Sequence, residues 1–395
     1  MPRFPQTATT SQRLDLSVYS SLAERAAASP GEIFPLHVGD TFLEPAKGCR
    51  MEDLRSEKYP GLGRYAPPQG LPEFLERLAA HVQGRTGVPT TRDDLLVTTG
   101  ATGGLAAAAG ALLEPGEEVL VPAPFWPLLP GIIHSYHGVP VVAPLLHAFS
   151  DPEAAIEALE SARTKRTAAL YLNTPNNPSG RQITREVLGA LVEWARQHDL
   201  WIWSDEVYED YAYTHPHVHC RSLAPERTLS IHSFSKAYGM AGYRCGYIVA
   251  PQEAISALSK IGTHSFYSTP TAAQHAASIV LGPAGEAWIR EAREIYQQTG
   301  REAARRLGLP PPDGGTFLFF DLARFLDHRG LASFLEELAD QGLLLAPGPS
   351  FGPFPTWARL CFTAAPPERV IQGVEILAQA LGRSTSDPPS ALEPA

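Results

Sequence analysis

The sequence has few cysteines, and it lacks both a long apolar run and an apolar segment of signal-peptide length at its start. Its four cysteines, Cys49, Cys220, Cys245 and Cys361, are scattered and form none of the close pairs typical of zinc or redox sites. No stretch reaches the roughly 18 apolar residues that a membrane helix needs. We therefore expect reduced structural thiols, no membrane span and a cytoplasmic protein.

The sequence also has no excess of positive charge: 32 Lys and Arg residues stand against 42 Asp and Glu residues, for a formal net charge of -10. Without a general basic field, neither nucleic acid nor an anionic membrane surface is an expected partner. An anionic ligand must then be held by local basic residues. The 395 residues, 44% of them hydrophobic, are enough for two or more domains with a large core.

Short β-rich runs alternate with helical patterns after about residue 95, which favours an α/β fold with a mainly parallel sheet flanked by helices. The expected strands are Leu95–Thr98, Glu118–Val121, Pro140–Leu145, Thr167–Leu172, Leu200–Ser204, Arg227–His232 and Gly246–Ala250. A small-residue turn should open a helix over Gly100–Leu113. Further expected helices are Phe125–His137, Pro152–Ala162, Arg185–His198 and Pro270–Leu281.

The C-terminal part has the pattern of a smaller α+β domain, joined to the first by a long amphipathic run over Ala284–Leu307. Its expected elements are strands at Thr316–Leu322, Gly342–Leu345 and Trp357–Phe362 and helices at Leu331–Gln341 and Pro367–Leu381. We predict a large domain over residues 46–300 and a small domain over 301–382. Residues 1–45 would form an arm with one short helix and part of the small domain, and 383–395 a flexible tail.

The segment IHSFSKAYGMAGYRCGY, Ile231–Tyr247, sets a single lysine, Lys236, among small and hydroxylated residues. A lone lysine is most often a solvated surface charge. Here Ser233 and Ser235 precede it and Arg244 follows, so an amine able to form a Schiff base stands near groups able to hold a phosphate. This combination indicates pyridoxal 5'-phosphate (PLP). Glycines that let the backbone approach a ligand follow at positions 239, 242 and 246.

Three further segments place polar or aromatic groups at strand ends. In VTTGATGG, the backbone of Gly100, Ala101 and Thr102 could face an anion at a helix start, although tight packing is the commoner reason for small residues there. Trp126 could stack on a flat ring or simply fill the core. Asn177, in the NTPNNPSG loop, could donate to a ring oxygen or shape a turn.

Two charged residues end or interrupt apolar strands. Asp205 closes the strand of LWIWSDEVY, where a buried carboxylate needs a cation such as a protonated pyridine nitrogen, unless it caps the next segment. Tyr208 follows three residues later and could reach the phenolic oxygen of the same ring. Arg359, in WARLCF, could bind the carboxylate of a ligand with its planar fork or belong to a structural ion pair.

The segment HPHVHC places His215, His217 and His219 at alternate positions, as metal ligands on a strand would be. No carboxylate or cysteine set in the sequence completes a convincing site, and Pro216 argues against a regular strand. We therefore expect a surface loop and no metal.

Together these motifs resemble the class I and II aminotransferases, PLP enzymes of fold type I, from about Pro35 to Leu381. The most specific are NNPSG, SDEVY and SFSKAYGMAGYRCGY, in the order and spacing of the family. The resemblance implies a seven-stranded-type sheet and a Schiff base on Lys236, which also carries the proton. It implies that Asp205 pairs with the pyridine nitrogen, Tyr208 and Asn177 with the ring oxygen, and that Trp126 stacks on the ring.

The remaining site residues also follow from this resemblance. Those implied to hold the phosphate are Gly100, Ala101, Thr102, Ser233, Ser235 and Arg244. Arg359 matches the arginine that binds the substrate α-carboxylate, with Asn177 and Gly39 beside it. Tyr65, in GRYAPPQG, matches a tyrosine that reaches the phosphate of the neighbouring subunit, which implies a homodimer.

The implied reaction transfers the amino group of an L-amino acid to a 2-oxo acid by a ping-pong mechanism. Bacterial aspartate aminotransferases of this branch often carry a lysine at the position of Thr102, so we expect neutral, aromatic or aliphatic substrates over aspartate. We expect the segment His264–Tyr267 to contribute to the side-chain pocket near a partner subunit. A PLP-dependent C–S β-lyase remains an alternative. A PLP-sensing regulator is remote, since only about 35 residues precede the matching region, too few for a DNA-binding module.

Overall fold

The computed structural model describes residues 6–14, 22, 24–26, 31–146, 148–382 and 392–394, and its central element is a seven-stranded sheet. The strand order is β1-β7-β6-β5-β4-β2-β3. The strands are β1 (Leu95–Thr98), β2 (Glu118–Ala123), β3 (Val139–Pro144), β4 (Thr167–Asn173), β5 (Trp201–Asp205), β6 (Thr228–Ser233) and β7 (Gly246–Val249). Only β7 runs against its neighbours, so the mainly parallel sheet predicted from the sequence is confirmed.

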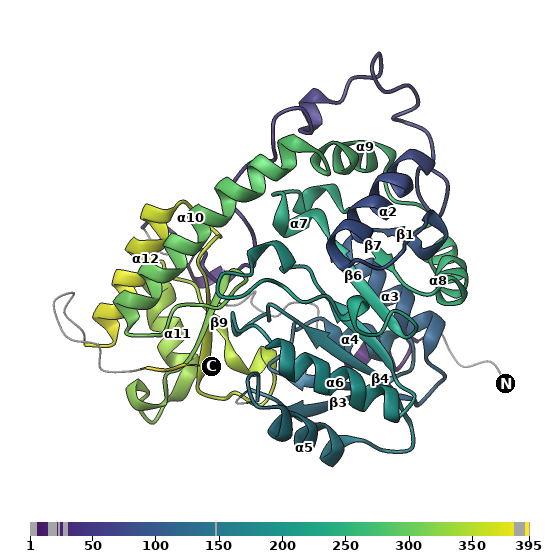
Figure 1. Ribbon diagram of the computed structural model, residues 1–395. Helices are drawn as coiled ribbons and strands as arrows, with labels where there is room; N and C mark the ends of the chain where they lie inside the picture. The colour runs from purple at the N-terminus through teal and green to yellow at the C-terminus, as the bar shows by residue number, and fades with distance from the viewer. Residues whose placement is uncertain are drawn as a thin grey trace.

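Helices cover both faces of this sheet (Figure 1). One face packs against α3 (Gly100–Leu112), α4 (Leu129–Ser135) and α8 (Gln252–Ser265). The opposite face packs against α5 (Pro152–Ala162), α6 (Arg185–Gln197), α2 (Pro72–Thr86) and α9 (Thr271–Val280). Strand residues alternate between the two layers, as β geometry requires: Tyr171 joins the first core and Leu170 and Leu172 the second.

The low side-chain volume of α3 lets this helix lie close to the sheet. A Cβ on Gly104 would lie 3.2 Å from Cδ1 of Ile248 and 3.4 Å from Cγ2 of Ile231. A larger residue at this position would therefore push α3 away from β6 and β7. The start of α3, which borders the cavity described below, is fixed by this contact.

A second, antiparallel sheet has the order β11-β8-β10-β9. Its strands are β8 (Phe317–Asp321), β9 (Ala346–Pro347), β10 (Trp357–Cys361) and β11 (Glu393–Pro394). The accompanying helices are α11 (Gly330–Asp340) and α12 (Pro367–Ala380). The 25-residue α10 (Pro283–Leu307) runs from α9 to α12 and joins the two parts of the molecule (Figure 1). The predicted domain limits stay a prediction.

The two sheets share apolar packing. Phe319 of β8 and Trp357 of β10 lie in the same core as residues of the large sheet, with ring centroids 4.9 Å apart. On the N-terminal side, Phe34 forms a bridge with Leu343 and donates its backbone N–H to Gly342. Residues ahead of the large sheet therefore pack with the C-terminal part.

Three expected boundaries differ from the structure. The strand expected over Gly342–Leu345 is wrong, because Leu343 pairs with Phe34 only as an isolated bridge and β9 begins at Ala346. Helix α4 begins at Leu129 rather than Phe125, leaving the segment with Trp126 in a loop. In the expected tail, β11 pairs with β8, while residues 383–391 and 395 lie outside the described part.

Most of the short helix expected near the N-terminus also lies outside the described residues. Among the helices that the structure does describe, none combines the length and apolar character needed to cross a membrane.

Candidate active site

A cavity of about 400 Å³ lies where several strands of the large sheet end. It is bordered by the ends of β4, β5 and β6 and by the start of α3, the edge at which open α/β sheets bind ligands. Most residues predicted from the sequence line it, namely Gly39, Ala101, Thr102, Trp126, Asn177, Asp205, Tyr208, Ser233, Ser235, Lys236, Arg244 and Arg359. Gly39 and Arg359, 320 positions apart in the sequence, thus meet in one place.

Asp205 ends β5 and is 6% exposed. Its Oδ2 accepts a hydrogen bond of 2.7 Å from the hydroxyl of Tyr171, and its Oδ1 accepts one of 3.3 Å from the backbone N–H of Val207. Burial raises the pKa of Asp205 to about 6, although the Tyr171 bond opposes this shift. Among the described residues, the carboxylate has hydrogen-bond donors but no cation in contact, so a protonated ring nitrogen would find a strong acceptor there.

Lys236 lies in the short helix α7 (Phe234–Ala237), which begins directly after β6. Ser233 caps this helix: its Oγ accepts from the backbone N–H of Ser235 at 3.1 Å. The Nζ of Lys236 donates to the carbonyl oxygen of Gly39 and lies 4.0 Å from Asp40 Oδ1. Burial lowers the pKa of this amine, which favours the neutral, nucleophilic form.

The opposite end of the cavity is shaped by Arg244 and two glycines. Arg244 has φ of +52°, and its guanidinium donates to the carbonyl oxygens of Ala241 and Thr99 at 2.9 and 3.3 Å. A Cβ on Gly100 would lie 2.8 Å from Nη2 of this arginine, and one on Gly246 would lie 2.8 Å from the carbonyl carbon of Gly100. The helix start and the guanidinium therefore approach closely enough to hold one anion together.

Arg359 reaches the cavity from β10 of the small sheet and is 3% exposed. Its Nη1 donates to Oδ1 of Asn177 at 2.8 Å and its Nη2 to the carbonyl oxygen of His37 at 2.6 Å. Its Nε is buried without a hydrogen-bond partner in the described structure. These neutral acceptors do not balance its charge, so the arrangement favours a ligand carboxylate over the structural ion pair considered above.

Three other predicted residues complete the walls. Tyr208 is 4% exposed and contacts Phe317 edge to face, with ring centroids 5.7 Å apart. Burial raises the pKa of Tyr208, so its hydroxyl stays protonated and can donate. The backbone N–H of Asn177 donates to Oδ1 of Asn173 at 2.7 Å, which fixes the loop. Trp126 is half-buried at the edge of the cavity.

Tyr65 and the segment His264–Tyr267, both predicted to contribute to an active site, do not line the cavity of this chain. Tyr65 is 85% exposed and contacts Tyr267, with ring centroids 5.1 Å apart. Neither residue lines the cavity, nor do the other members of the segment His264–Tyr267. Gly100 also does not line it, but its close contact with Arg244 shapes it.

A model of the family described as aminotransferase class I and II matches residues 36–377. The chain belongs to this family. A probable aspartate/prephenate aminotransferase of Thermus aquaticus is 36% identical over 331 residues, 81% of this chain and 84% of that protein. An arginine–pyruvate transaminase of Pseudomonas aeruginosa is 31% identical over 337 residues, 82% of this chain and 83% of that protein.

The structure of Thermus thermophilus aspartate aminotransferase with maleate is also similar, with a TM-score of 0.86 and 29% identity, over 95% of this chain and all of that one. As a member of this family, the present chain is a PLP-dependent transaminase that acts on amino acids and 2-oxo acids. The cavity fits this cofactor, because it combines a buried lysine, a carboxylate without a cation and a narrow anion-binding end.

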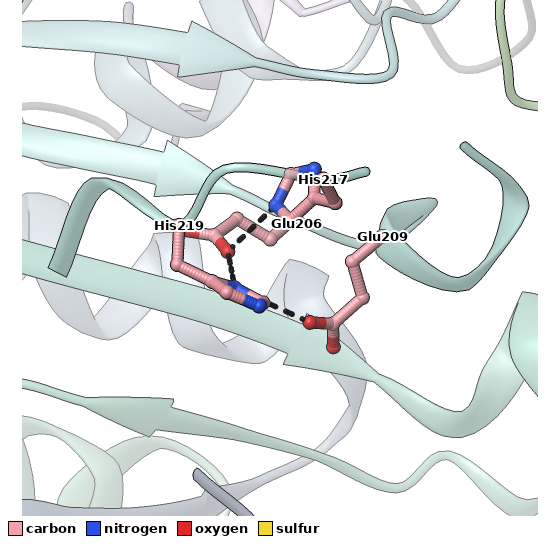
Figure 2. A group of neighbouring side chains, drawn as sticks. All are labelled: Glu206, Glu209, His217 and His219. Carbon is pink, nitrogen blue, oxygen red and sulfur yellow. Dashed lines mark hydrogen bonds and ion pairs between the residues drawn. The ribbon is translucent and has the colours of Figure 1, made fainter. Parts of the chain in front are cut away.

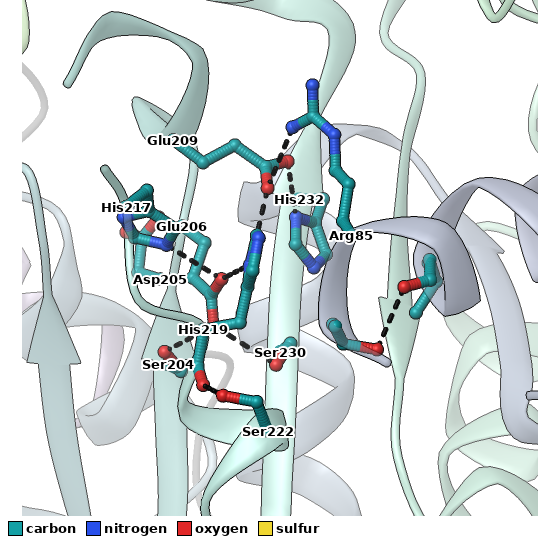
Figure 3. A network of polar contacts seen from close by, with 12 residues as sticks. Arg85, Ser204, Asp205, Glu206, Glu209, His217, His219, Ser222, Ser230 and His232 are labelled. Carbon is teal, nitrogen blue, oxygen red and sulfur yellow. Dashed lines mark hydrogen bonds and ion pairs between the residues drawn. The ribbon is translucent and has the colours of Figure 1, made fainter. Parts of the chain in front are cut away.

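The surface-loop prediction for the histidine segment is wrong. His215 is exposed, but His217 and His219 turn inward, with side chains only 6% and 10% exposed, and both contact the fully buried Glu206. Figure 3 shows them within a polar network that continues through Glu209. Contact with Glu206 raises the pKa of His219 to about 9 against the effect of burial. The surface-loop interpretation failed because the carboxylates precede the histidines by 8 to 13 residues and meet them only in the fold.

The sequence also missed residues that support Asp205 from the neighbouring strand. Tyr171 and Asn173 both belong to β4, and Asn173 stands beside Asp205 in the parallel register. The side-chain amide of Asn173 donates to the backbone carbonyl of Asp205 at 2.9 Å. Their spacing of two residues places both side chains on the same face of β4, which the sequence alone could have indicated. That they face Asp205 follows only once β4 is known to pair with β5.

Proposed function

We propose that this aminotransferase prefers neutral, aromatic or aliphatic L-amino acids over aspartate and passes the amino group to a 2-oxo acid by a ping-pong mechanism. The observation that carries this proposal is the set of cations that line the cavity, Lys236, Arg244 and Arg359. Lys236 and Arg244 serve the cofactor, and Arg359 serves the α-carboxylate. Among the described residues that line the cavity, no other basic residue is left for a second carboxylate.

The wall near the predicted substrate side is largely apolar. It includes Val38, Trp126, Pro127 and Leu128, of which Val38 and Leu128 are 44% and 46% exposed. These side chains would gain from contact with an apolar substrate side chain, at roughly 25 cal/mol per Å² of apolar surface buried. A carboxylate at the same place would lose hydration without a compensating cation.

We assign the cofactor contacts as follows. Asp205 would accept a hydrogen bond from the ring nitrogen and so keep that nitrogen protonated. Tyr171 orients the Asp205 carboxylate through its hydrogen bond to Oδ2. Tyr208 and Asn177 lie at the ring oxygen and Trp126 at the ring face. The groups assigned to the phosphate are the helix start at Gly100, Ala101 and Thr102, the side chains of Ser233 and Ser235, and Arg244. When bound, PLP supplies an electron-withdrawing ring that stabilises negative charge on the substrate α-carbon.

The amine of Lys236, when free, would also act as a base. Its Nζ is held at the carbonyl oxygen of Gly39, two residues after His37, whose carbonyl oxygen accepts from Arg359. With its pKa lowered by burial, the free amine can accept the proton of the substrate α-carbon and hold it at Nζ. Arg359 fixes the α-carboxylate, so the α-carbon stays within reach of the amine.

A panel of amino donors, each mixed with the purified PLP form, tests the substrate proposal. We expect the visible absorption of the cofactor to shift to that of its amine form faster with leucine, phenylalanine or tyrosine than with aspartate. An aspartate rate equal to the best neutral donor would contradict the preference, without affecting transamination. Release of ammonia and a 2-oxo acid from a sulfur-containing donor, without the amine form, would support a β-lyase instead.

The Lys236→Ala variant tests the assignment of the lysine. It should lose the visible band that wild type shows after incubation with PLP, and it should lose transamination. Lys260→Ala, in α8, is a matched control for removal of an amine outside the cavity. A wild-type band in Lys236→Ala would overturn the assignment.

We also propose that the active enzyme is a homodimer in which Tyr65 reaches the phosphate of the neighbouring subunit. This is supported by the 85% exposure of Tyr65 and by its contact with Tyr267, itself 46% exposed, since exposed aromatic pairs are typical of interfaces. Light scattering should give twice the monomer mass of 42.7 kDa. Tyr65→Phe should weaken cofactor binding in the dimer, and a monomeric, fully active enzyme would contradict the proposal.

We place the enzyme in the cytoplasm. The support is that Cys49, Cys220, Cys245 and Cys361 are all unpaired and buried. Free thiols are typical of reducing compartments. Cell fractionation tests this location.

A further inference from the structure

We propose that Glu206, Glu209, His217 and His219 form a binding site for a divalent zinc ion, separate from the cavity that binds PLP. One ligand atom of each residue lies within 4.8 Å of those of the others. Figure 2 shows the two imidazoles and the two carboxylates turned toward a common centre. None of the four residues lines the active-site cavity.

The distances are close to those of a four-ligand zinc site. Zinc takes nitrogen and carboxylate oxygen at about 2.0–2.2 Å, so tetrahedral ligand atoms stand roughly 3.3 Å apart. Oε2 of Glu206 lies 3.0 Å from Nε2 of His217 and 2.6 Å from Nδ1 of His219, and the latter lies 3.5 Å from Oε2 of Glu209. Shifts of about an ångström in these side chains would admit the ion.

A second layer of hydrogen bonds orients both carboxylates. Hydroxyls of Ser204 and Ser230 donate to Oε1 of Glu206 at 2.8 and 3.1 Å and leave Oε2 for the imidazoles (Figure 3). Nδ1 of His232 lies 2.9 Å from Oε1 of Glu209, which leaves Oε2 directed at His219. Hydrogen bonds from outer residues that orient the ligating side chains are typical of metal sites.

Two buried atoms of this group lack a hydrogen-bond partner in the described structure, Oε2 of Glu209 and Nδ1 of His217. Oε2 of Glu209, in a side chain 8% exposed, accepts no hydrogen bond of good geometry in the described structure. It lies 3.0 Å from Nη1 of Arg85, but that guanidinium also binds Asp210. A metal ion could therefore take Oε2 while Arg85 keeps a carboxylate partner.

The local charge also favours a divalent cation. The side chains of Glu206, Glu209 and Asp210 are all less than 10% exposed. Among the described residues, Arg85 contacts Glu209 and Asp210, whereas Glu206 contacts the two histidines and two serine hydroxyls and no arginine or lysine. Two protonated imidazoles would also balance this charge. The nitrogen and oxygen donor set matches zinc, whereas calcium and magnesium prefer oxygen alone.

A bound ion would connect the segment His217–His219 to the end of β5 and to the short helix that begins at Glu209. Asp205 and Tyr208 each precede one of the proposed ligands by one residue. The ion would hold the backbone of these active-site residues in place without contacting the substrate. It is expected to raise thermal stability more than catalytic rate.

The PLP-loaded enzyme, freed of metal with a chelator and dialysed, is titrated with ZnCl₂ by calorimetry, with MgCl₂ as the comparison. We expect one zinc per chain, tight enough to survive desalting, and an increase in thermal midpoint with zinc but not with magnesium. The zinc X-ray absorption spectrum should show nitrogen and oxygen ligands including two imidazoles. Sulfur ligands would place the ion at a cysteine and overturn the site.

Variants locate the ion. His219→Ala should weaken zinc binding by on the order of 100-fold or more, and Ser230→Ala, which removes one supporting hydroxyl, by about tenfold. His215→Ala is the matched control from the same loop, with an exposed side chain, and should bind as wild type does. If His219→Ala does not fold, the zinc affinity of Ser230→Ala compared with that of His215→Ala still tests the site. Absence of zinc binding at micromolar concentration in wild type, or equal binding in Ser230→Ala and wild type, would overturn the proposal and favour protonated imidazoles.

Discussion

The hydroxyl of Tyr171 donates a hydrogen bond of 2.7 Å to Oδ2 of Asp205 at the end of the adjacent strand. Both residues are buried, so this bond is one of the few contacts that stabilise the ionised carboxylate. Burial alone would move the pKa of Asp205 further upward than its value of about 6. The pair thus sets how fully Asp205 is charged at neutral pH.

Tyr171→Phe should raise the pKa of Asp205, because a hydrogen bond to the charged form is lost. A bond of this kind contributes about 1.5–3 kcal/mol, so we expect PLP affinity or kcat/KM to fall by at least tenfold. The pH profile of activity should also move upward. Tyr213→Phe is the control, since it removes a buried hydroxyl that donates to Gly315 instead. Unchanged activity and pH profile in Tyr171→Phe would contradict this role.

Arg359→Lys should raise the KM for every amino donor while leaving the PLP spectrum unchanged. Lysine keeps the charge but loses the planar fork and its contact with the ring of Phe317, 4.3 Å away. We expect kcat/KM to fall by about 30-fold or more. Arg369→Lys, which alters a partly exposed ion pair with Glu32, should retain wild-type kinetics. A similar loss in both variants would mean that the effect is on folding.

Thr102→Lys should improve the use of aspartate relative to leucine. The substitution places an amine in the cavity wall. In wild type, the proposed assignments leave no cation of the described lining for the side-chain carboxylate of aspartate. A partly exposed ion pair contributes on the order of 1 kcal/mol, so the ratio of the two kcat/KM values should change by about fivefold. Thr102→Gln serves as the control of similar length without charge. An equal change in both variants would rule out the electrostatic explanation.

His37→Asn should make the protein less sensitive to mild acid. Burial, and to a smaller extent Arg359, lowers the pKa of His37 to about 4, below its unfolded value of 6.5. The neutral form is favoured in the fold, so this contribution is present above pH 6.5 and is lost as the pH falls toward 4. At pH 5 the loss is about 2 kcal/mol. Thermal midpoints at pH 7.5 and 5 should differ more in wild type than in His37→Asn, with His215→Asn behaving as wild type.

The strands of the large sheet could be predicted from the sequence because each is a short apolar run between turn residues. The end of one strand led to Asp205, since a charged group at the end of a buried strand is costly without a partner, whereas Lys236 was singled out by the serines and the arginine around it. Arg359 was found by the same argument as Asp205. Local sequence was enough for these residues because each is unusual among its own neighbours.

Contacts between strands and loops could not be predicted in this way. Tyr171 is an ordinary residue in an apolar strand, and its role depends on the register of β4 against β5. His219 was recognised as unusual, but the approach of Glu206 depends on how the chain returns after Glu209. Such partners become visible only when the fold brings together segments that are separate in the sequence.

Lys236 lies in α7, directly after β6 of the large sheet, and Arg359 lies in β10 of the small sheet. A substrate that engages both is therefore a non-covalent crosslink between the two parts of the molecule. By linkage, a ligand at 100 times its dissociation constant adds about 2.7 kcal/mol to the state in which they are held together. Local opening of the small sheet is then coupled to occupancy, and its amide hydrogens should exchange more slowly as the cavity fills.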